Sequence, residues 1–336
     1  MINYRVISAV MRSPPKLCNL ISIFFVAIYR AATVRFLRGL MIQYPPAMAQ
    51  LARNIPTTVA QHFNYRFKYD DNRNIRLKLA VGYLTFETNE SWRQSFNSHE
   101  NFVSLHRWNW LLRDVNDGQL AGFDEGMALV RSWLSEIGVS PKGNAGESYT
   151  VGERVSNLCL FARQKKGNWT SIPIDLQEAL KYKAKFLAHR LEYMPGNLTG
   201  NHLLNNARAL LLAGHCCDLD SAKVISRSIM ASHLTIIIDE RGFLREGSSH
   251  YQFLVTRWLL EIRLISEEMR DLETLEIIKD FLPSMINACK FFLVETVECN
   301  KEMVLFGDIS PDCEPSWLID ITKSALAKFN NNSVNE

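Results

Sequence analysis

The chain has 336 residues, of which 47% are hydrophobic and 22% charged, and its formal net charge is +3. This content is enough to bury one large core or two modest ones. The mild charge suits an acidic ligand, and the absence of a basic tract argues against nucleic acid as a partner. Seven cysteines without metal-like spacing, two of them adjacent at Cys216 and Cys217, favour reduced thiols over a disulfide framework.

The N-terminal region, residues 1–95, is expected to be an irregular helical lead-in with short strands at 64–69 and 79–86. Its apolar stretch from Leu17 to Ile28 is shorter than the ~20 residues that span a bilayer. It also lacks a strong small-residue cleavage site. We therefore predict an amphipathic or core helix and favour a cytoplasmic protein, with a periplasmic or membrane-associated protein as the alternative.

Residues 96–300 carry the apolar periodicity of helices. The pattern predicts helices at 101–113, 124–137, 150–163, 174–193, 201–213 and 220–238, and another beginning near 250. Every second helix begins about fifty residues after the last, which is the size of a helical hairpin. We therefore predict a mainly all-α fold, an incomplete α/α toroid of helical hairpins, with a stacked α-solenoid as the alternative.

Two constellations of polar residues begin helices in this region. Asn201 and His202 open a helix for which Gly214 is the expected stop, and Tyr251 opens another that Ser248 or Ser249 would cap. One helix and two turns separate them, so the chain returns to the end from which it started. We therefore expect an amide, an imidazole and a phenol to converge at one end of neighbouring parallel helices.

The last segment, residues 301–336, begins with a predicted short strand at 303–308 that leads into a loop. The polar tail, residues 330–336, is expected to fray.

Several of these stretches resemble the heparinase II/III-like polysaccharide lyases. The resemblance rests on residues 201–210, on 246–251, on 149–154 with Asn157, and on 306–312. It covers about residues 90–315, and it implies a helical α/α toroid, which agrees with the fifty-residue period. Full-length relatives continue into a β-sandwich after the segment that contains Gly307 and Asp308. Because 28 residues follow Asp308 here, we expect residues 301–336 to be a remnant of the linker to a missing sandwich, which a separate partner chain could supply. We also expect weak activity from the chain alone.

The resemblance also implies a chemistry. Such lyases cleave beside a uronic acid by β-elimination, which needs a base at C5, an acid at the departing oxygen and donors on the carboxylate. The implied catalytic residues are Asn201 on the carboxylate, Tyr251 as base, acid or both, and His202 as a second base or donor. The implied substrate-binding residues are Tyr149, Arg154, Asn205 and Glu246. No cofactor and no metal are expected, and the expected ligand is an acidic polysaccharide or oligosaccharide.

Each of these residues also has a purely structural interpretation. Asn201 is suited to a helix cap, His202 to packing or capping, and Tyr251 to the core. Arg154 is equally suited to a salt bridge with Glu153 or Glu147. Trp108 and Trp110 suit either a stacking platform for sugars or, more commonly, a core. The role of His106 is left open, and His250 is expected to be structural.

Three functions are compatible with this pattern. The first is a lyase acting on uronate polymers. The second is a uronyl C5-epimerase, which uses the same residues to abstract a proton but returns it to the other face. The third is a non-catalytic glycan-binding protein of a surface-polysaccharide pathway. A toroidal glycoside hydrolase ranks lower, because no convincing pair of carboxylates is visible.

Overall fold

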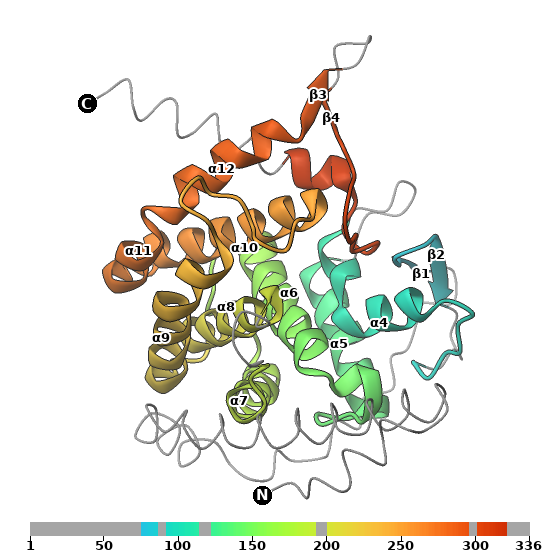
Figure 1. The fold of residues 1–336 in the computed structure, drawn as a ribbon. Helices are drawn as coiled ribbons and strands as arrows, with labels where there is room; N and C mark the ends of the chain where they lie inside the picture. Colours follow the sequence, from blue (N-terminus) through green and yellow to red (C-terminus); the bar gives the residue numbers. More distant parts are fainter. Residues whose placement is uncertain (1–74, 87–91, 114–121, 193–199, 296–300, 321–336) are drawn as a thin grey trace, which may run out of the picture.

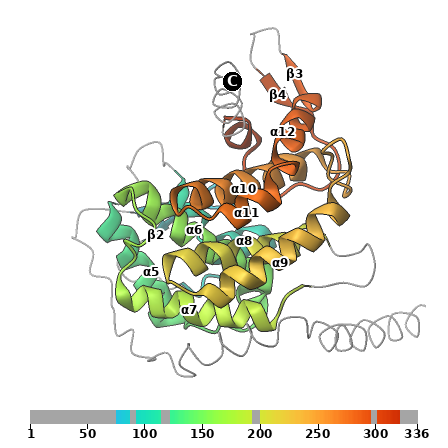
Figure 2. The ribbon, with the colours of Figure 1, turned by 90° about the vertical axis from the view of Figure 1, so that its left-hand side faces the viewer.

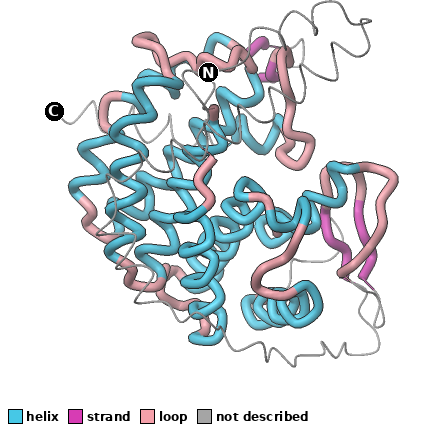
Figure 3. The backbone as a smooth tube through the Cα atoms, turned by 60° about the horizontal axis from the view of Figure 1, so that its bottom comes forward, coloured by secondary structure: helices cyan, strands magenta, loops and turns pink. Residues whose placement is uncertain are grey.

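The described part of this computed structural model comprises residues 75–86, 92–113, 122–192, 200–295 and 301–320. It is mainly helical, with two short strand hairpins at its periphery (Figures 1 and 3). The predictions for 17–28, 64–69 and 330–336 fall outside these residues. None of the described helices is both long and apolar enough to cross a membrane.

The helices follow the predicted pattern closely. They are α4 (His99–Arg107), α5 (Phe123–Ile137), α6 (Ser148–Lys166), α7 (Ile174–His189), α8 (Asn201–Cys216), α9 (Asp220–Ile237), α10 (Ser249–Glu268), α11 (Leu272–Ile278) and α12 (Phe281–Phe291), with short 3₁₀ turns at Asn109–Leu112 and Gly143–Gly146. Helix α6 contacts α4 and α8, and α8 in turn contacts α10. Helix α7 packs beside α6 and α8, and α9 beside α8, so alternate helices form two layers.

The strands form two separate antiparallel hairpins. In the first, β1 (Ile75–Lys78) pairs with β2 (Tyr83–Phe86). The strand expected at 79–86 therefore begins only at Tyr83, and its partner β1 precedes it in the sequence. In the second, β3 (Leu293–Glu295) pairs with β4 (Lys301–Met303), which precedes most of the strand expected at 303–308. Both views in Figures 1 and 2 place α12 and this second hairpin beyond α10, at the edge opposite α7.

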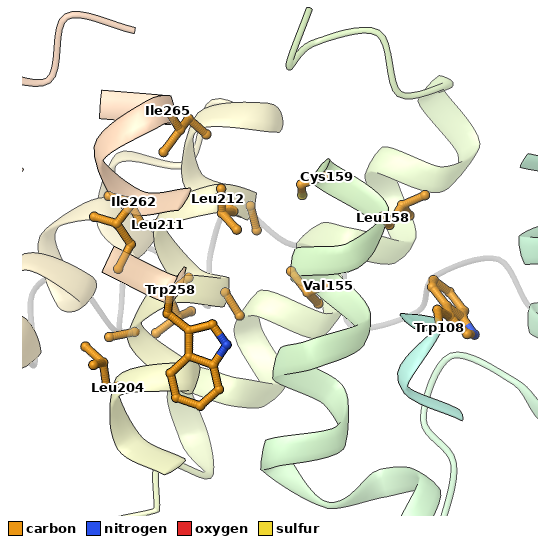
Figure 4. Packing of buried hydrophobic residues seen from close by; sticks show 14 of the residues in the cluster. Trp108, Val155, Leu158, Cys159, Leu204, Leu211, Leu212, Trp258, Ile262 and Ile265 are labelled. Atoms are coloured by element: carbon orange, nitrogen blue, oxygen red, sulfur yellow. The ribbon is translucent and has the colours of Figure 1, made fainter. Parts of the chain in front are cut away.

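One part of the core lies between α6, α8 and α10. Trp258 of α10 is completely buried against α8 and α6, and Val155 and Leu204 are buried with it (Figure 4). Trp108 lies on the other side of α6, also without exposed surface. Trp110 is 2% exposed, so both tryptophans belong to the core and neither is a platform for sugars.

Several helix ends differ from the prediction: α7, for example, ends at His189 and not at 193. The helix expected at 101–113 stops at Arg107, because Trp108 takes a left-handed conformation with a φ of 62° before the 3₁₀ turn. Gly214 does not stop α8, which continues to Cys216. A side chain at Gly214 would lie 2.7 Å from Lys223 Cγ and 3.3 Å from the Leu219 carbonyl oxygen. This glycine therefore allows the beginning of α9 to approach α8 closely.

Candidate functional site

The first turns of α6 and α8 are in direct contact. The Asn205 side-chain amide donates to the Tyr149 carbonyl oxygen over 3.1 Å. The Tyr149 and His202 rings lie with their centroids 4.5 Å apart. A phenol and an imidazole from different helices therefore face one another at the N-terminal end of this pair.

The beginning of α10 joins the same end through Glu246. The carboxylate of Glu246 accepts hydrogen bonds from both the backbone N–H and the side-chain Nδ2 of Asn201, each 2.7 Å long. Two residues later Ser248 caps α10 by accepting the N–H of Tyr251, as the sequence predicts. The N-terminal ends of α6, α8 and α10 thus lie together, each carrying an aromatic or amide side chain.

His202 is exposed, with 55% of its side chain accessible. Its Nδ1 lies 3.2 Å from a carboxylate oxygen of Glu192. A carboxylate only accepts hydrogen bonds, so this contact assigns the proton to Nδ1. In the neutral imidazole Nε2 is then an acceptor, which is the state that a general base requires.

The two tyrosines remain protonated at neutral pH. Burial raises the pKa of Tyr149, and the carboxylate of Glu153 adds to the effect. Burial also raises the pKa of Tyr251, helped by the carboxylates of Asp308 and Glu246. Both phenols are therefore suited to donate a proton or a hydrogen bond.

Sequence reasoning missed a cation beside this group. The Arg107 guanidinium lies 4.8 Å from the centroid of the Tyr149 ring, and its Nη1 is 2.8 Å from the carboxylate of Asp312. Asp312 is buried and also accepts from Asn109 over 2.8 Å and from Ser310 over 2.6 Å. No local pattern could have linked Arg107 to a carboxylate 205 positions away.

The segment from Phe306 to Cys313 crosses the beginning of α10. The Phe306 carbonyl accepts the N–H of Ser249 over 3.2 Å, and the Ser248 hydroxyl donates to the Asp308 carbonyl over 2.5 Å. His250 donates from Nε2 to the Cys313 carbonyl, and its Nδ1 accepts the N–H of Ser310. His250 is therefore structural, as expected, and the segment brings Asp308 and Asp312 to the site.

Arg154, a predicted substrate contact, does not lie on this surface. It has no exposed area, and its Nε and Nη2 donate to the carbonyls of His106 and Ala145 over 2.7 and 2.5 Å. Its guanidinium stacks 4.3 Å from the Trp133 ring, and burial lowers its pKa to about 9. Within the described residues, Glu153 forms its ion pair with Arg208, over 3.0 Å, and not with Arg154 as the sequence allowed.

Three other residues have structural contacts. Asn205 is fully buried between α6 and α8, so its amide supports Tyr149 rather than facing solvent. His106 is also buried, accepts the indole N–H of Trp133 over 3.1 Å, and has a pKa lowered to about 3, mainly by burial. Glu246 is exposed, but both of its oxygens contact Asn201.

Comparison of the chain with models of protein families, with curated proteins and with solved structures found no match. The described residues also contain no cluster of three His, Cys, Asp or Glu side chains that could hold a metal ion. A functional assignment therefore depends on the geometry at the ends of α6, α8 and α10.

Proposed function

We propose that the chain is a polysaccharide lyase that cleaves uronate-containing polysaccharide by β-elimination. The observation that carries the proposal is the convergence of Tyr149, Asn201 and His202 at the N-terminal ends of α6 and α8, with Tyr251 joined to them through Glu246. We also propose that the two layers of helical hairpins are part of an incomplete α/α toroid, with α4, α6, α8 and α10 as its inner helices.

The uronate carboxylate is proposed to bind at Asn201, which is 4% exposed, whereas Arg154 and Asn205 have no exposed surface. The Asn201 side-chain amide donates one of its two protons to Glu246, so the second can be donated to a ligand. The N-terminal end of α8 adds partial positive charge at the same place. Arg107 supplies a full charge nearby, and 13% of its side chain is exposed. These groups would stabilise the negative charge that builds on the carboxylate when C5 loses its proton.

His202 is proposed as the base that takes the C5 proton, because its Nε2 is the acceptor and its side chain is accessible. A tyrosine is proposed as the acid that protonates the departing oxygen. Tyr251 suits this role because its pKa is raised and its ring is half-buried. In this assignment the base and the acid are different side chains. Proton abstraction at C5 and protonation of the departing oxygen can therefore both occur while the substrate stays bound.

The test is the formation of unsaturated uronate, followed by its absorbance, when the purified chain is incubated with a panel of uronate polymers. We expect product from at least one polymer and a loss of about 10²–10⁴-fold in kcat for Tyr251→Phe and for His202→Ala. Tyr182→Phe is the matched control, since Tyr182 lies on α7, and it should keep full activity. Binding of a uronate polymer without any product would contradict the proposal and favour a glycan-binding protein.

A further inference from the structure

Glu246 contacts Asn201 in a way that defines how the Asn201 amide points. Its Oε1 accepts the backbone N–H and its Oε2 accepts the side-chain Nδ2, both over 2.7 Å. A carboxylate has no proton to donate, so it selects the nitrogen end of the amide. The Oδ1 end then points elsewhere, where it is buried without a protein partner.

Gly200 makes this contact sterically feasible. A Cβ atom at position 200 would overlap Oε1 of Glu246, so any other residue would push the carboxylate away from the beginning of α8. The Gly200 carbonyl oxygen is held from the other side by Nε2 of His233, over 2.9 Å. His233 is 2% exposed and belongs to α9, so the outer layer of helices also fixes this backbone.

We infer that Glu246 is a positioning residue for Asn201, acting with Gly200 and His233, and is not a contact for the substrate. The inference rests on the proposed function, in which Asn201 binds the uronate carboxylate. Both carboxylate oxygens of Glu246 already accept hydrogen bonds from Asn201. The negative charge of Glu246 would also repel a substrate carboxylate. The contact therefore serves to present the free amide proton of Asn201 in one orientation.

Glu246→Gln tests this role with little change of shape. The glutamine replaces one of the two acceptor oxygens by an NH₂ donor, so it cannot accept the two N–H groups of Asn201 on two separate oxygens as Glu246 does. We expect kcat to fall by about tenfold to a hundredfold, which is typical of a misplaced reacting group, while KM stays within about twofold. Glu240→Gln is the matched control, because Glu240 is an exposed carboxylate nearby in the sequence, and it should leave both constants unchanged.

A double-variant comparison separates positioning from direct contact. If Glu246 acts through Asn201, Glu246→Gln should have little further effect on kcat once Asn201→Ala is present. Losses that add in the double variant would overturn the inference. So would tighter binding of a uronate oligosaccharide by Glu246→Gln, which would mean that Glu246 only occupies the place of the substrate carboxylate.

A measurement without substrate keeps the inference separate from the proposed function. The side-chain amide signals of Asn201 in a ¹H–¹⁵N spectrum, assigned by their loss in Asn201→Ala, should shift in Glu246→Gln and in Gly200→Ala but not in Glu240→Gln. Unchanged signals in Glu246→Gln would refute the positioning role even if the chain is an active lyase. Shifted signals in a chain that cleaves no uronate would support the contact and reject the lyase.

Discussion

Replacing Asp312 by asparagine should destabilise the protein more than any other single change of charge at the site. Asp312 is 4% exposed and accepts hydrogen bonds from Arg107, Asn109 and Ser310. Asparagine keeps the size of the side chain but removes the charge that balances Arg107. Breaking a buried ion pair from one side costs about 3–5 kcal/mol. We expect about 3 kcal/mol, the lower end of that range, because 13% of the Arg107 side chain remains in water.

The loss should depend on pH in a defined direction. Burial alone would raise the pKa of Asp312, but the charge of Arg107 and the hydrogen bond from Ser310 outweigh it, and the net effect is a lowered pKa. A carboxylate with a lowered pKa stabilises the fold above its unfolded value, about 3.9, and loses that contribution as the pH falls through the folded value. The difference between the wild type and Asp312→Asn should therefore be constant from neutral pH to about 4 and shrink below it.

Urea unfolding followed by circular dichroism measures this difference directly. Asp308→Asn is the control, since Asp308 lies in the same segment but is exposed, and it should change the free energy of unfolding by less than about 0.5 kcal/mol. Arg107→Met combined with Asp312→Asn should cost less than the sum of the two single changes, because no unpaired charge is left. A loss below about 1 kcal/mol for Asp312→Asn would refute the argument.

Two further changes test the interior and the segment that crosses α10. The folded pKa of His106 is about 3, so from this residue the wild type should lose about 1.4 kcal/mol of stability per pH unit between about pH 6 and about pH 3, and His106→Asn should lack that dependence in acid-titrated unfolding curves. Equal acid sensitivity in both proteins would show that His106 is not buried as described. Gly307→Ala should destabilise the protein by at least about 1 kcal/mol more than Gly138→Ala in urea unfolding. Both glycines have positive φ values, 74° and 90°, but a side chain at Gly307 would lie 2.8 Å from the Gly247 carbonyl oxygen, whereas nothing lies within 4 Å at Gly138. Equal losses would contradict the close approach.

The periodicity of the sequence predicts the helices well because their buried faces repeat along the chain. The beginning of α10 follows from its Ser248 cap, whereas α6 and α8 begin without a side-chain cap and follow from their apolar stripes alone. The errors have long-range causes. Gly214 is explained by the close approach of α9 and not by a helix end, and Arg154 is buried because it stacks on the Trp133 ring and donates to the carbonyls of His106 and Ala145.

As with the helices, the local features of the candidate site were predictable from the sequence and its long-range contacts were not. The positions of Asn201, His202 and Tyr251 near the beginnings of two helices could be read from local sequence. The place of Arg107 beside Tyr149 could not, since Asp312 determines it from the far end of the chain. The role of Glu246 was also hidden, because an exposed carboxylate in a loop shows no partner until the fold is known.

The most direct test of the proposed function is the mass of the product formed from a defined uronate oligosaccharide in deuterated water. β-Elimination adds no water, so once the exchangeable deuterons have been replaced by hydrogen we predict two fragments whose masses sum to that of the substrate, one with an unsaturated uronate end. Fragments that together weigh one water molecule more would identify a hydrolase, for which the carboxylates of Glu246 and Asp308 near Tyr251 would be the first residues to examine. Uptake of deuterium without cleavage would identify an epimerase. Either of the last two results, or an unchanged substrate across the panel of uronates, would contradict the proposal.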